Sequence, residues 1–370
     1  MKIGIITMHR VTNFGSALQA YALQQALIKL GYENEIINYI FPHKNKSSIF
    51  STIELFLRKK IYELRTGVFF SKKKEDYFKE FRRFFLSLSD KTYTLESINT
   101  NPPKYDLYMT GSDQVWNPKW MEGDTNFLLS FVQSKPKVSY ASSFAVNTIP
   151  AESKEIYKKY LQEYKHITVR ENSGEIIVDD LLGTRKADVV CDPTILLDKG
   201  DYIKIAKVPR IEIQGPYILV YILDYMFNPY PGVNQIIKSV AATLGMPVVY
   251  IGGKYTVYDS HCKYIENLGP CEFIWLFQHA DFVVTTSFHG SAFATIFQKP
   301  LLAVVKDTND NDGRIITLMR KVGNERALIS YTANIEYKAE YLRQLTSNNM
   351  EYQSYKEESL KKLQQIVENI

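Results

Sequence analysis

Cysteine is scarce in this chain, with only Cys191, Cys262 and Cys271 among 370 residues. An odd number of widely spaced cysteines excludes the disulfide framework that stabilises many small secreted domains. Cys262 and Cys271 flank a loop beside His261, but their spacing matches no standard zinc site. We therefore expect no metal site, and no motif in the sequence requires a bound cofactor.

Long apolar runs are also missing, because no stretch is long enough to cross a bilayer as a helix. The N-terminus, MKIGIITM, enters a strand-like pattern directly and shows no signal-peptide pattern. These absences predict a cytoplasmic protein. Its net charge of +5 suits anionic small ligands or an acidic membrane surface, and it does not require nucleic acid as a partner.

The chain opens with a strand–helix–strand pattern that is typical of a doubly wound α/β domain. We predict a strand over Lys2–Met8, a helix over Ala17–Leu30 and a strand over Asn34–Tyr39. The first loop, HRVTNFGS, lacks the G-x-G-x-x-G pattern of dinucleotide-binding sites. Asn13 to Gly15 therefore indicates either a tight turn near a ligand or an ordinary turn.

The alternating pattern loosens around Asp198–Gly215 and then starts again, which predicts two α/β domains of similar build. We expect the first domain over residues 1–205 and the second over 206–350. Residues 351–370 have a helical pattern and are predicted to pack back on the first domain. The cleft between the strand ends of the two domains is the expected site.

Residues 44–90 differ from the rest of the first domain and are predicted to be an inserted set of helices. Basic residues cluster there among phenylalanines: Arg58, Lys59, Lys60, Lys72, Lys73, Lys74, Arg82 and Arg83 beside Phe69, Phe70, Phe78, Phe81, Phe84 and Phe85. Helices with one basic face and apolar aromatics can dock on an anionic membrane. The alternative is a solvated helical face that packs on the domain.

Polar residues follow two predicted strands of the first domain. Ser112 and Asp113 come directly after the strand Tyr105–Thr110, and Asp113 is suited to orient an acceptor hydroxyl or to act as a base. Arg170 follows another short strand, where its guanidinium can hold a phosphate or a carboxylate in bidentate fashion. The alternative for Arg170 is a salt bridge to Glu171 or another nearby acid.

The most informative stretch is Asp281–Val305, which reads as strand, turn, helix and strand, with His289 and Gly290 at the first turn. Ligands of open α/β sheets bind at such turns, and the start of a helix favours an anion. Gly290 would let a ligand approach the backbone closely. His289 can change protonation near neutral pH and can donate to a phosphate or an oxyanion. The alternative is that His289 only caps the helix.

Short motifs recur in a fixed order along almost the whole chain. They are NFGSALQ at Asn13–Gln19, GSDQVWN at Gly111–Asn117, SYASSF at Ser139–Phe144, VRE at Val169–Glu171, DPT at Asp192–Thr194, SFHG at Ser287–Gly290 and GRI at Gly313–Ile315. This set resembles the polysaccharide pyruvyl transferase family. The resemblance implies two Rossmann-like domains that face each other across a cleft, as in B-type glycosyltransferases.

The resemblance also implies a reaction, the transfer of a pyruvyl group from phosphoenolpyruvate to a sugar, which forms a pyruvyl ketal. The acceptor would be a glycan of a surface polysaccharide or its lipid-linked precursor, bound on the side of the first domain, with the donor on the second. Phosphoenolpyruvate would be a co-substrate, and no cofactor is expected. The protein would be cytoplasmic, with peripheral contact to the inner face of the membrane as an open alternative.

In the family, arginines and a histidine hold the donor, and the histidine is the candidate acid. These roles carry over to Arg170 as donor clamp and to His289 as general acid or phosphate binder, and we expect Asp113 to be the acceptor-side base. The other predicted binding residues are Asn13, Gly15, Ser112, Ser287, Gly290, Ser291 and Arg314. Many members have arginine where this chain has Ser287, so one anion contact is either missing or supplied by Arg314 or Lys306.

Two other functions remain open from the sequence. A nucleotide-sugar glycosyltransferase of the same build would use the helix start after His289 for a diphosphate. A non-catalytic binding protein would keep the fold without the transfer reaction, and Ser287 is the feature in favour of that interpretation.

Overall fold

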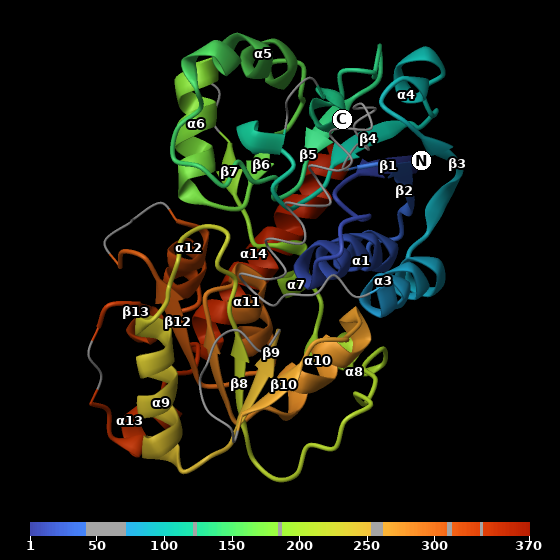
Figure 1. Ribbon diagram of the computed structural model, residues 1–370. Helices are drawn as coiled ribbons and strands as arrows, with labels where there is room; N and C mark the ends of the chain where they lie inside the picture. The colour runs from blue at the N-terminus through green and yellow to red at the C-terminus, as the bar shows by residue number, and fades with distance from the viewer. Residues whose placement is uncertain (42–71, 121–123, 184–186, 253–261, 309–312, 334–335) are drawn as a thin grey trace, which may run out of the picture.

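Figure 1 shows the computed structural model of the protein, which describes residues 1–41, 72–120, 124–183, 187–252, 262–308, 313–333 and 336–370. The chain forms two α/β domains, one built around each of two parallel sheets. In Figure 1 the first domain, blue to green, lies above the second, yellow to red.

The sheet of the first domain has the strand order β3-β2-β1-β4-β5, and every pairing in it is parallel. Its strands are β1 (Lys2–Ile6), β2 (Glu33–Tyr39), β3 (Leu88–Tyr93), β4 (Leu107–Thr110) and β5 (Lys137–Ser139). A short parallel pair, β6 (Thr168–Val169) and β7 (Asp188–Val189), continues this sheet beyond β5 through backbone bridges from Val138 and Ser142.

The sheet of the second domain has the order β10-β9-β8-β11-β12-β13, again with parallel pairings throughout. Its strands are β8 (Ile218–Tyr221), β9 (Val248–Ile251), β10 (Lys263–Ile265), β11 (Phe282–Thr285), β12 (Leu301–Val305) and β13 (Leu328–Ser330). The central strands β8, β11 and β12 are apolar and fully buried, as expected for a sheet that helices cover on both faces. In both sheets the order reverses next to the first strand, which is the crevice where ligands of doubly wound sheets bind.

Helices connect the strands. In the first domain they are α1 (Phe14–Lys29), α3 (Lys72–Phe85), α4 (Ser97–Thr100), α5 (Ala151–Leu161), α6 (Asn172–Leu182), α7 (Pro193–Leu196) and α8 (Lys199–Ile203). In the second they are α9 (Gly232–Leu244), α10 (Pro270–His279), α11 (Phe288–Ile296), α12 (Arg314–Lys321), α13 (Ala339–Arg343) and α14 (Asn349–Glu368). Within the described residues, none of the helices is long and apolar enough to cross a bilayer.

The two domains share a continuous apolar core. Phe14 at the start of α1 stacks on Phe273 of α10, with ring centres 4.5 Å apart, and both rings are buried. The last helix, α14, runs from the second domain up to the first (Figure 1). There Lys362 Nζ lies 2.6 Å from Asp188, and the Ser359 hydroxyl accepts a hydrogen bond from the backbone N–H of Cys191 at 2.9 Å.

The helical insertion predicted over residues 44–90 ends earlier in the structure than in the prediction. Its boundary at residue 90 is wrong, because Leu88–Tyr93 is the edge strand β3, which pairs with β2. The exposed side chains of α3 carry both signs of charge: Lys73, Glu75, Asp76, Lys79, Glu80 and Arg83, beside Phe84. The predicted basic face is therefore absent from the exposed side of α3, and residues 42–71 lie outside the described residues.

Candidate active site

A cavity of about 570 Å³ lies between the carboxyl ends of the two sheets. Residues that follow β1, β4, β5 and β6 line it from the first domain, and residues that follow β8, β11 and β12 line it from the second. Five of the predicted site residues lie on its wall: Asn13, Asp113, Ser287, His289 and Arg314. The cavity is thus at the crevice where the sheet topology places a ligand.

His289 lies in the first turn of α11 and is almost completely buried at the cavity wall. The helix is capped by Ser287, whose hydroxyl accepts a hydrogen bond from the backbone N–H of Gly290 at 3.2 Å. The capping role is therefore filled by Ser287 and not by His289. The imidazole instead crosses to the first domain, where its Nε2 lies 3.5 Å from Asp192 Oδ2.

Gly15 provides the surface on which the imidazole rests. A Cβ atom at residue 15 would lie 1.9 Å from His289 Nδ1, so any side chain there would displace the ring. Gly15 is the second residue of α1, and Asn13 caps that helix by accepting a hydrogen bond from the Ser16 N–H at 3.2 Å. The predicted turn near a ligand is in fact this helix start.

Asp192 is the acid that anchors this group of residues. Its Oδ1 accepts hydrogen bonds from the Thr194 N–H at 2.9 Å and the Thr194 hydroxyl at 2.7 Å. Its Oδ2 accepts from Ser112 Oγ at 3.0 Å and from Arg170 Nη1 at 2.7 Å. Burial by itself would raise the pKa of Asp192, but His289 and Arg170 hold that pKa well below its ordinary value. The carboxylate is therefore ionised and fixed in direction.

Arg170 does not line the cavity. Its side chain is buried, and its guanidinium lies within 4 Å of three carboxylates: Asp192 at 2.7 Å, Asp113 at 3.9 Å and Glu171 at 3.9 Å. The ring of Phe288, which lies on the cavity wall, covers the guanidinium at 4.4 Å. The salt-bridge alternative for Arg170 is therefore present, and a direct grip on the donor would require Phe288 to move.

Asp113 has a backbone φ of 78°, which is a strained conformation for a residue with a side chain. One carboxylate oxygen accepts from the Gln114 N–H at 2.9 Å, and the other accepts from the hydroxyl of Ser16. The carboxylate is thus held at the cavity wall of the first domain, where an acceptor hydroxyl can reach it.

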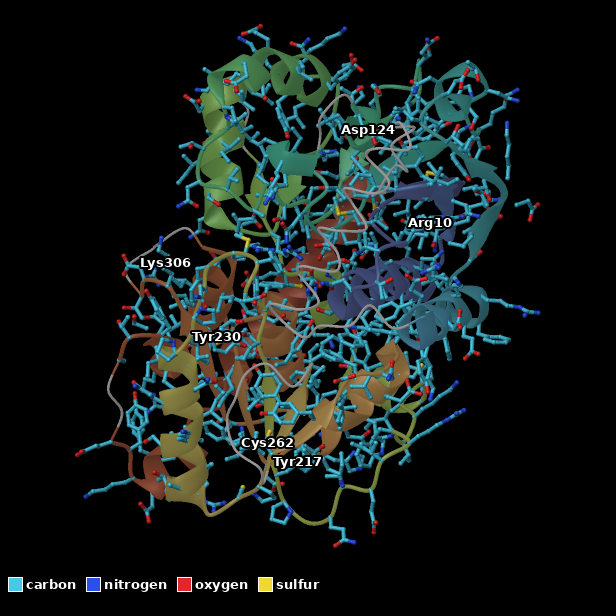
Figure 2. The ribbon with its side chains drawn as sticks, in the orientation of Figure 1. Arg10, Asp124, Tyr217, Tyr230, Cys262 and Lys306 are labelled. Carbon is cyan, nitrogen blue, oxygen red and sulfur yellow. The ribbon has the colours of Figure 1, made fainter. Side chains whose placement is uncertain are left out.

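Lys306 and Arg314 bring positive charge to the wall formed by the second domain, where Asp307 also lies, and Lys119 adds a positive charge from the first domain. Figure 2 shows Lys306 on the second domain where it faces the first. Within the described residues, neither Lys306 nor Arg314 forms an ion pair with an acidic side chain. Arg314 is also the first residue of α12, so its charge adds to the positive end of a helix. This wall is suited to an anionic ligand.

Three other predicted binding residues have a packing role. A Cβ at Gly290 would lie 2.3 Å from Thr285 Oγ1, so this glycine lets α11 approach β11 and does not open the backbone to a ligand. Ser291 Oγ donates to the backbone oxygen of Ser287 at 3.2 Å, and Ser112 donates to Asp192. These three residues do not line the cavity, and their contacts hold α11 and Asp192 in place behind its wall.

Sequence reasoning assigned no role to two residues that complete the site, Asp192 and Phe288, although both lie in the quoted motifs DPT and SFHG. Asp192 directly follows the apolar run that ends at Cys191, which is typical of a strand, and a carboxylate at a strand end was the available signal. Phe288 has no comparable signal, because a phenylalanine beside His289 is indistinguishable from a core residue in the sequence. In the described part of the chain, no group of three or more His, Cys, Asp or Glu side chains is placed to hold a metal ion.

The fold and the site define a two-domain α/β protein with a cavity between its domains and a buried carboxylate–histidine pair in the wall of this cavity. The chain belongs to the polysaccharide pyruvyl transferase family, whose model matches residues 13–307. This match confirms the family predicted from the sequence motifs. No curated protein matches the chain.

Solved structures of similar fold are UDP-GlcNAc 2-epimerases. The enzyme of Methanocaldococcus jannaschii, in complex with UDP-GlcNAc and UDP, has a TM-score of 0.54 and 13% identity, with 100% of both chains covered. The enzyme of Neisseria meningitidis, bound to UDP-GlcNAc, has the same TM-score and coverage at 11% identity. At this identity the likeness is one of fold, and it confirms two Rossmann-like domains arranged as in B-type glycosyltransferases.

Proposed function

We propose that the protein transfers a pyruvyl group from phosphoenolpyruvate to two hydroxyls of a sugar in a polysaccharide or its precursor, forming a pyruvyl ketal and releasing phosphate. Membership of the polysaccharide pyruvyl transferase family supports a transferase that acts on a glycan. The observation that carries the donor and the reaction is the buried pair of His289 and Asp192 at the wall of a cavity that Lys306 and Arg314 also line.

The donor carries a carboxylate and a phosphate, so its site needs more than one fixed positive charge. Lys306, Arg314 and the starts of α11 and α12 supply positive potential on the side of the second domain. Lys306, which follows β12, and Arg314 of α12 line the same cavity as Ser287. They can therefore replace the anion contact of an arginine at position 287. We assign the donor to this wall.

The reaction begins with a proton transfer from His289 to the methylene carbon of phosphoenolpyruvate, which turns it into a methyl group. The neighbouring carbon becomes cationic, and one sugar hydroxyl attacks it. A second hydroxyl of the same sugar then replaces the phosphate, which leaves as inorganic phosphate. The two hydroxyls lose two protons; one restores the protonated His289 and the other leaves with the phosphate group or the solvent. No oxidant or reductant is needed.

Asp113 faces the cavity from the first domain, which places the acceptor-side base opposite the donor wall. Its carboxylate is oriented by Ser16 and by the Gln114 N–H. An ionised carboxylate in this position can accept the proton of an attacking hydroxyl.

The test is to incubate the purified protein with phosphoenolpyruvate and a panel of cell-envelope glycans, both free and lipid-linked. Release of phosphate that depends on the glycan, with a gain of one carboxyethylidene group in its mass spectrum, is the expected result. His289→Gln should abolish both signals, and Lys338→Ala, an exposed change away from the cavity, should leave them unchanged. Full turnover in His289→Gln would contradict the proposal.

A nucleotide-sugar transferase is the second candidate, because the epimerases of similar fold are described in complex with UDP-GlcNAc or UDP. Calorimetry with UDP-GlcNAc and UDP, run beside phosphoenolpyruvate, separates the two. Binding of the nucleotides without binding of phosphoenolpyruvate would favour this candidate.

Contact with an anionic membrane is part of the proposal only as a peripheral interaction. The mixed charge on the exposed face of α3 gives it little support from that helix. Co-sedimentation with vesicles of anionic lipid at low salt tests it, and failure to co-sediment would remove the membrane from the proposal.

A further inference from the structure

We propose that Asp192 is the positioning residue of His289, and that the pair is assembled across the domain interface. The chemical use of the pair rests on the proposed function, in which His289 delivers a proton. The orientation of the imidazole does not, because it is measurable in the protein without any substrate.

The Asp192 carboxylate has little freedom to turn. The Thr194 N–H and hydroxyl hold one oxygen, and Ser112 and Arg170 hold the other, all at 2.7–3.0 Å. Asp192 is buried, and it lies just before α7 in the first domain. These four hydrogen bonds fix the orientation of the carboxylate, and His289 Nε2 lies 3.5 Å from its Oδ2.

His289 comes to this carboxylate from the second domain. It is positioned by the capped first turn of α11 and by contact with Gly15, a residue of the first domain. Its Nε2 is buried and makes no hydrogen bond within the described residues, and the Asp192 carboxylate lies 3.5 Å from it. A buried ring nitrogen next to an ionised carboxylate must carry its proton to avoid leaving both groups unsatisfied.

This arrangement fixes the tautomer of the neutral imidazole. With the proton on Nε2, the other ring nitrogen, Nδ1, which lies on the Gly15 side of the ring, carries the free lone pair. The carboxylate also stabilises the positive charge that the ring carries while it is protonated on both nitrogens. Asp192 therefore acts through His289 and does not touch the substrate.

The histidine–carboxylate pair is formed by residues of both domains. His289 and Phe288 belong to α11 of the second domain, and their contacts Asp192, Arg170 and Gly15 belong to the first. If the domains separated, the histidine would lose its carboxylate and Arg170 would lose its aromatic cover. The histidine–carboxylate pair therefore depends on the contact between the two domains.

The first experiment is nitrogen NMR of histidine-labelled protein without substrate, recorded at increasing pH until the imidazole signals stop changing. The His289 signals are assigned by their loss in His289→Gln. We expect the neutral ring of the wild type to carry its proton on Nε2, and we expect Asp192→Asn to populate the Nδ1–H form. A wild-type ring with its proton on Nδ1, or an unchanged tautomer in Asp192→Asn, would overturn the inference.

A second pair of variants keeps the test valid if Asp192→Asn does not fold. Gly15→Ala pushes the ring from its place because the new Cβ meets Nδ1, whereas Gly200→Ala adds a methyl group in α8 with nothing within 4 Å. The imidazole signals should change in Gly15→Ala and stay unchanged in Gly200→Ala. Identical His289 signals in both alanine variants would contradict the contact and with it the assembled pair.

A comparison of kcat with the Kd for phosphoenolpyruvate distinguishes a positioning role of Asp192 from a purely structural one. Asp192→Asn should lower kcat by about 10²–10⁴-fold, with the Kd for phosphoenolpyruvate within about threefold of wild type by calorimetry. An unchanged kcat, or a loss confined to KM, would overturn the positioning role. If the wild type shows no turnover with any acceptor, the proposed function fails, and the tautomer measurement still decides the inference about Asp192.

Discussion

The Arg170 guanidinium of the first domain lies 4.4 Å from the centre of the Phe288 ring of the second. The ring separates this cation from the cavity, and three carboxylates share the charge behind it: Asp113, Glu171 and Asp192. Two of these carboxylates, Asp113 and Asp192, belong to the candidate active site. Arg170 is therefore a buried counter-charge for these carboxylates, and together with His289 it holds the pKa of Asp192 below its ordinary value against the effect of burial.

Removal of this counter-charge should destabilise the fold. Arg170→Ala leaves buried acids without a cation, and loss of one partner of a buried ion pair typically costs about 3–5 kcal/mol. We expect a loss of this size in the free energy of unfolding, measured by urea denaturation. Arg326→Ala, a change at an exposed arginine, should cost less than about 0.5 kcal/mol. Equal losses in the two variants would contradict the role of Arg170 as buried counter-charge.

Ser287 provides a second prediction about stability. Its hydroxyl caps α11 by accepting the Gly290 N–H, and loss of an N-cap hydroxyl costs about 0.5–2 kcal/mol when alanine replaces serine. Glycine is tolerated at this position of a helix and should cost only a few tenths of a kcal/mol. Urea denaturation of Ser287→Ala and Ser287→Gly measures both. The prediction is wrong if glycine destabilises the protein more than alanine does.

His9 should make the protein less stable in mild acid. Burial lowers the pKa of His9 to about 4, although hydrogen bonds to Thr7 and Asn38 oppose the effect. The unfolded chain has an ordinary histidine pKa of about 6.5, so between these values the unfolded state binds the proton and the folded state does not. Stability is therefore complete above about pH 6.5 and decreases as the pH falls toward 4. The contribution of His9 to this loss is on the order of 2–3 kcal/mol at pH 4.5.

The measurement is the unfolding free energy at pH 7.5 and pH 4.5 for the wild type and for His9→Gln. The difference between the two pH values should shrink by the contribution of His9 in the variant. His279 is exposed, so His279→Gln serves as the control and should keep the wild-type difference. An undiminished difference in His9→Gln would show that His9 titrates normally in the folded protein.

Much of the fold and part of the site were predictable from the sequence, because apolar periodicity and strand-end residues are local signals. The run Phe282–Val284 and the turn at His289 are examples, since buried parallel strands and the polar residues after them follow one another in the chain. The edge strand β3 was missed because its sequence, LSDKTY, has no apolar run and gains its place by pairing with β2. That pairing is a tertiary effect with no local signature.

Contacts between residues far apart in the sequence also could not be predicted. Nothing in the spacing links Asp192 to His289, and their contact depends on how one domain docks on the other. Gly290 was expected to let a ligand approach the backbone, whereas it lets α11 pack on β11, because a glycine required for close packing looks the same in a sequence as one required for ligand approach. The buried position of Arg170 was likewise invisible, because an arginine after a strand looks the same whether it faces a cavity or lies under an aromatic ring.

Lys306 and Arg314 should provide the anion contacts that position 287 does not. Both line the cavity, and neither pairs with an acid within the described residues, so a bound phosphate or carboxylate would be their first ionic partner. A hydrogen bond to a charged group contributes about 1.5–3 kcal/mol, so each of Lys306→Ala and Arg314→Ala should weaken phosphoenolpyruvate binding by about tenfold or more.

Calorimetry at low and high salt measures the affinity for phosphoenolpyruvate, and the wild-type affinity should fall as salt increases. Lys338→Ala is the control for the loss of one positive charge from the second domain. Unchanged affinity in both cavity variants would place the donor elsewhere in the cleft.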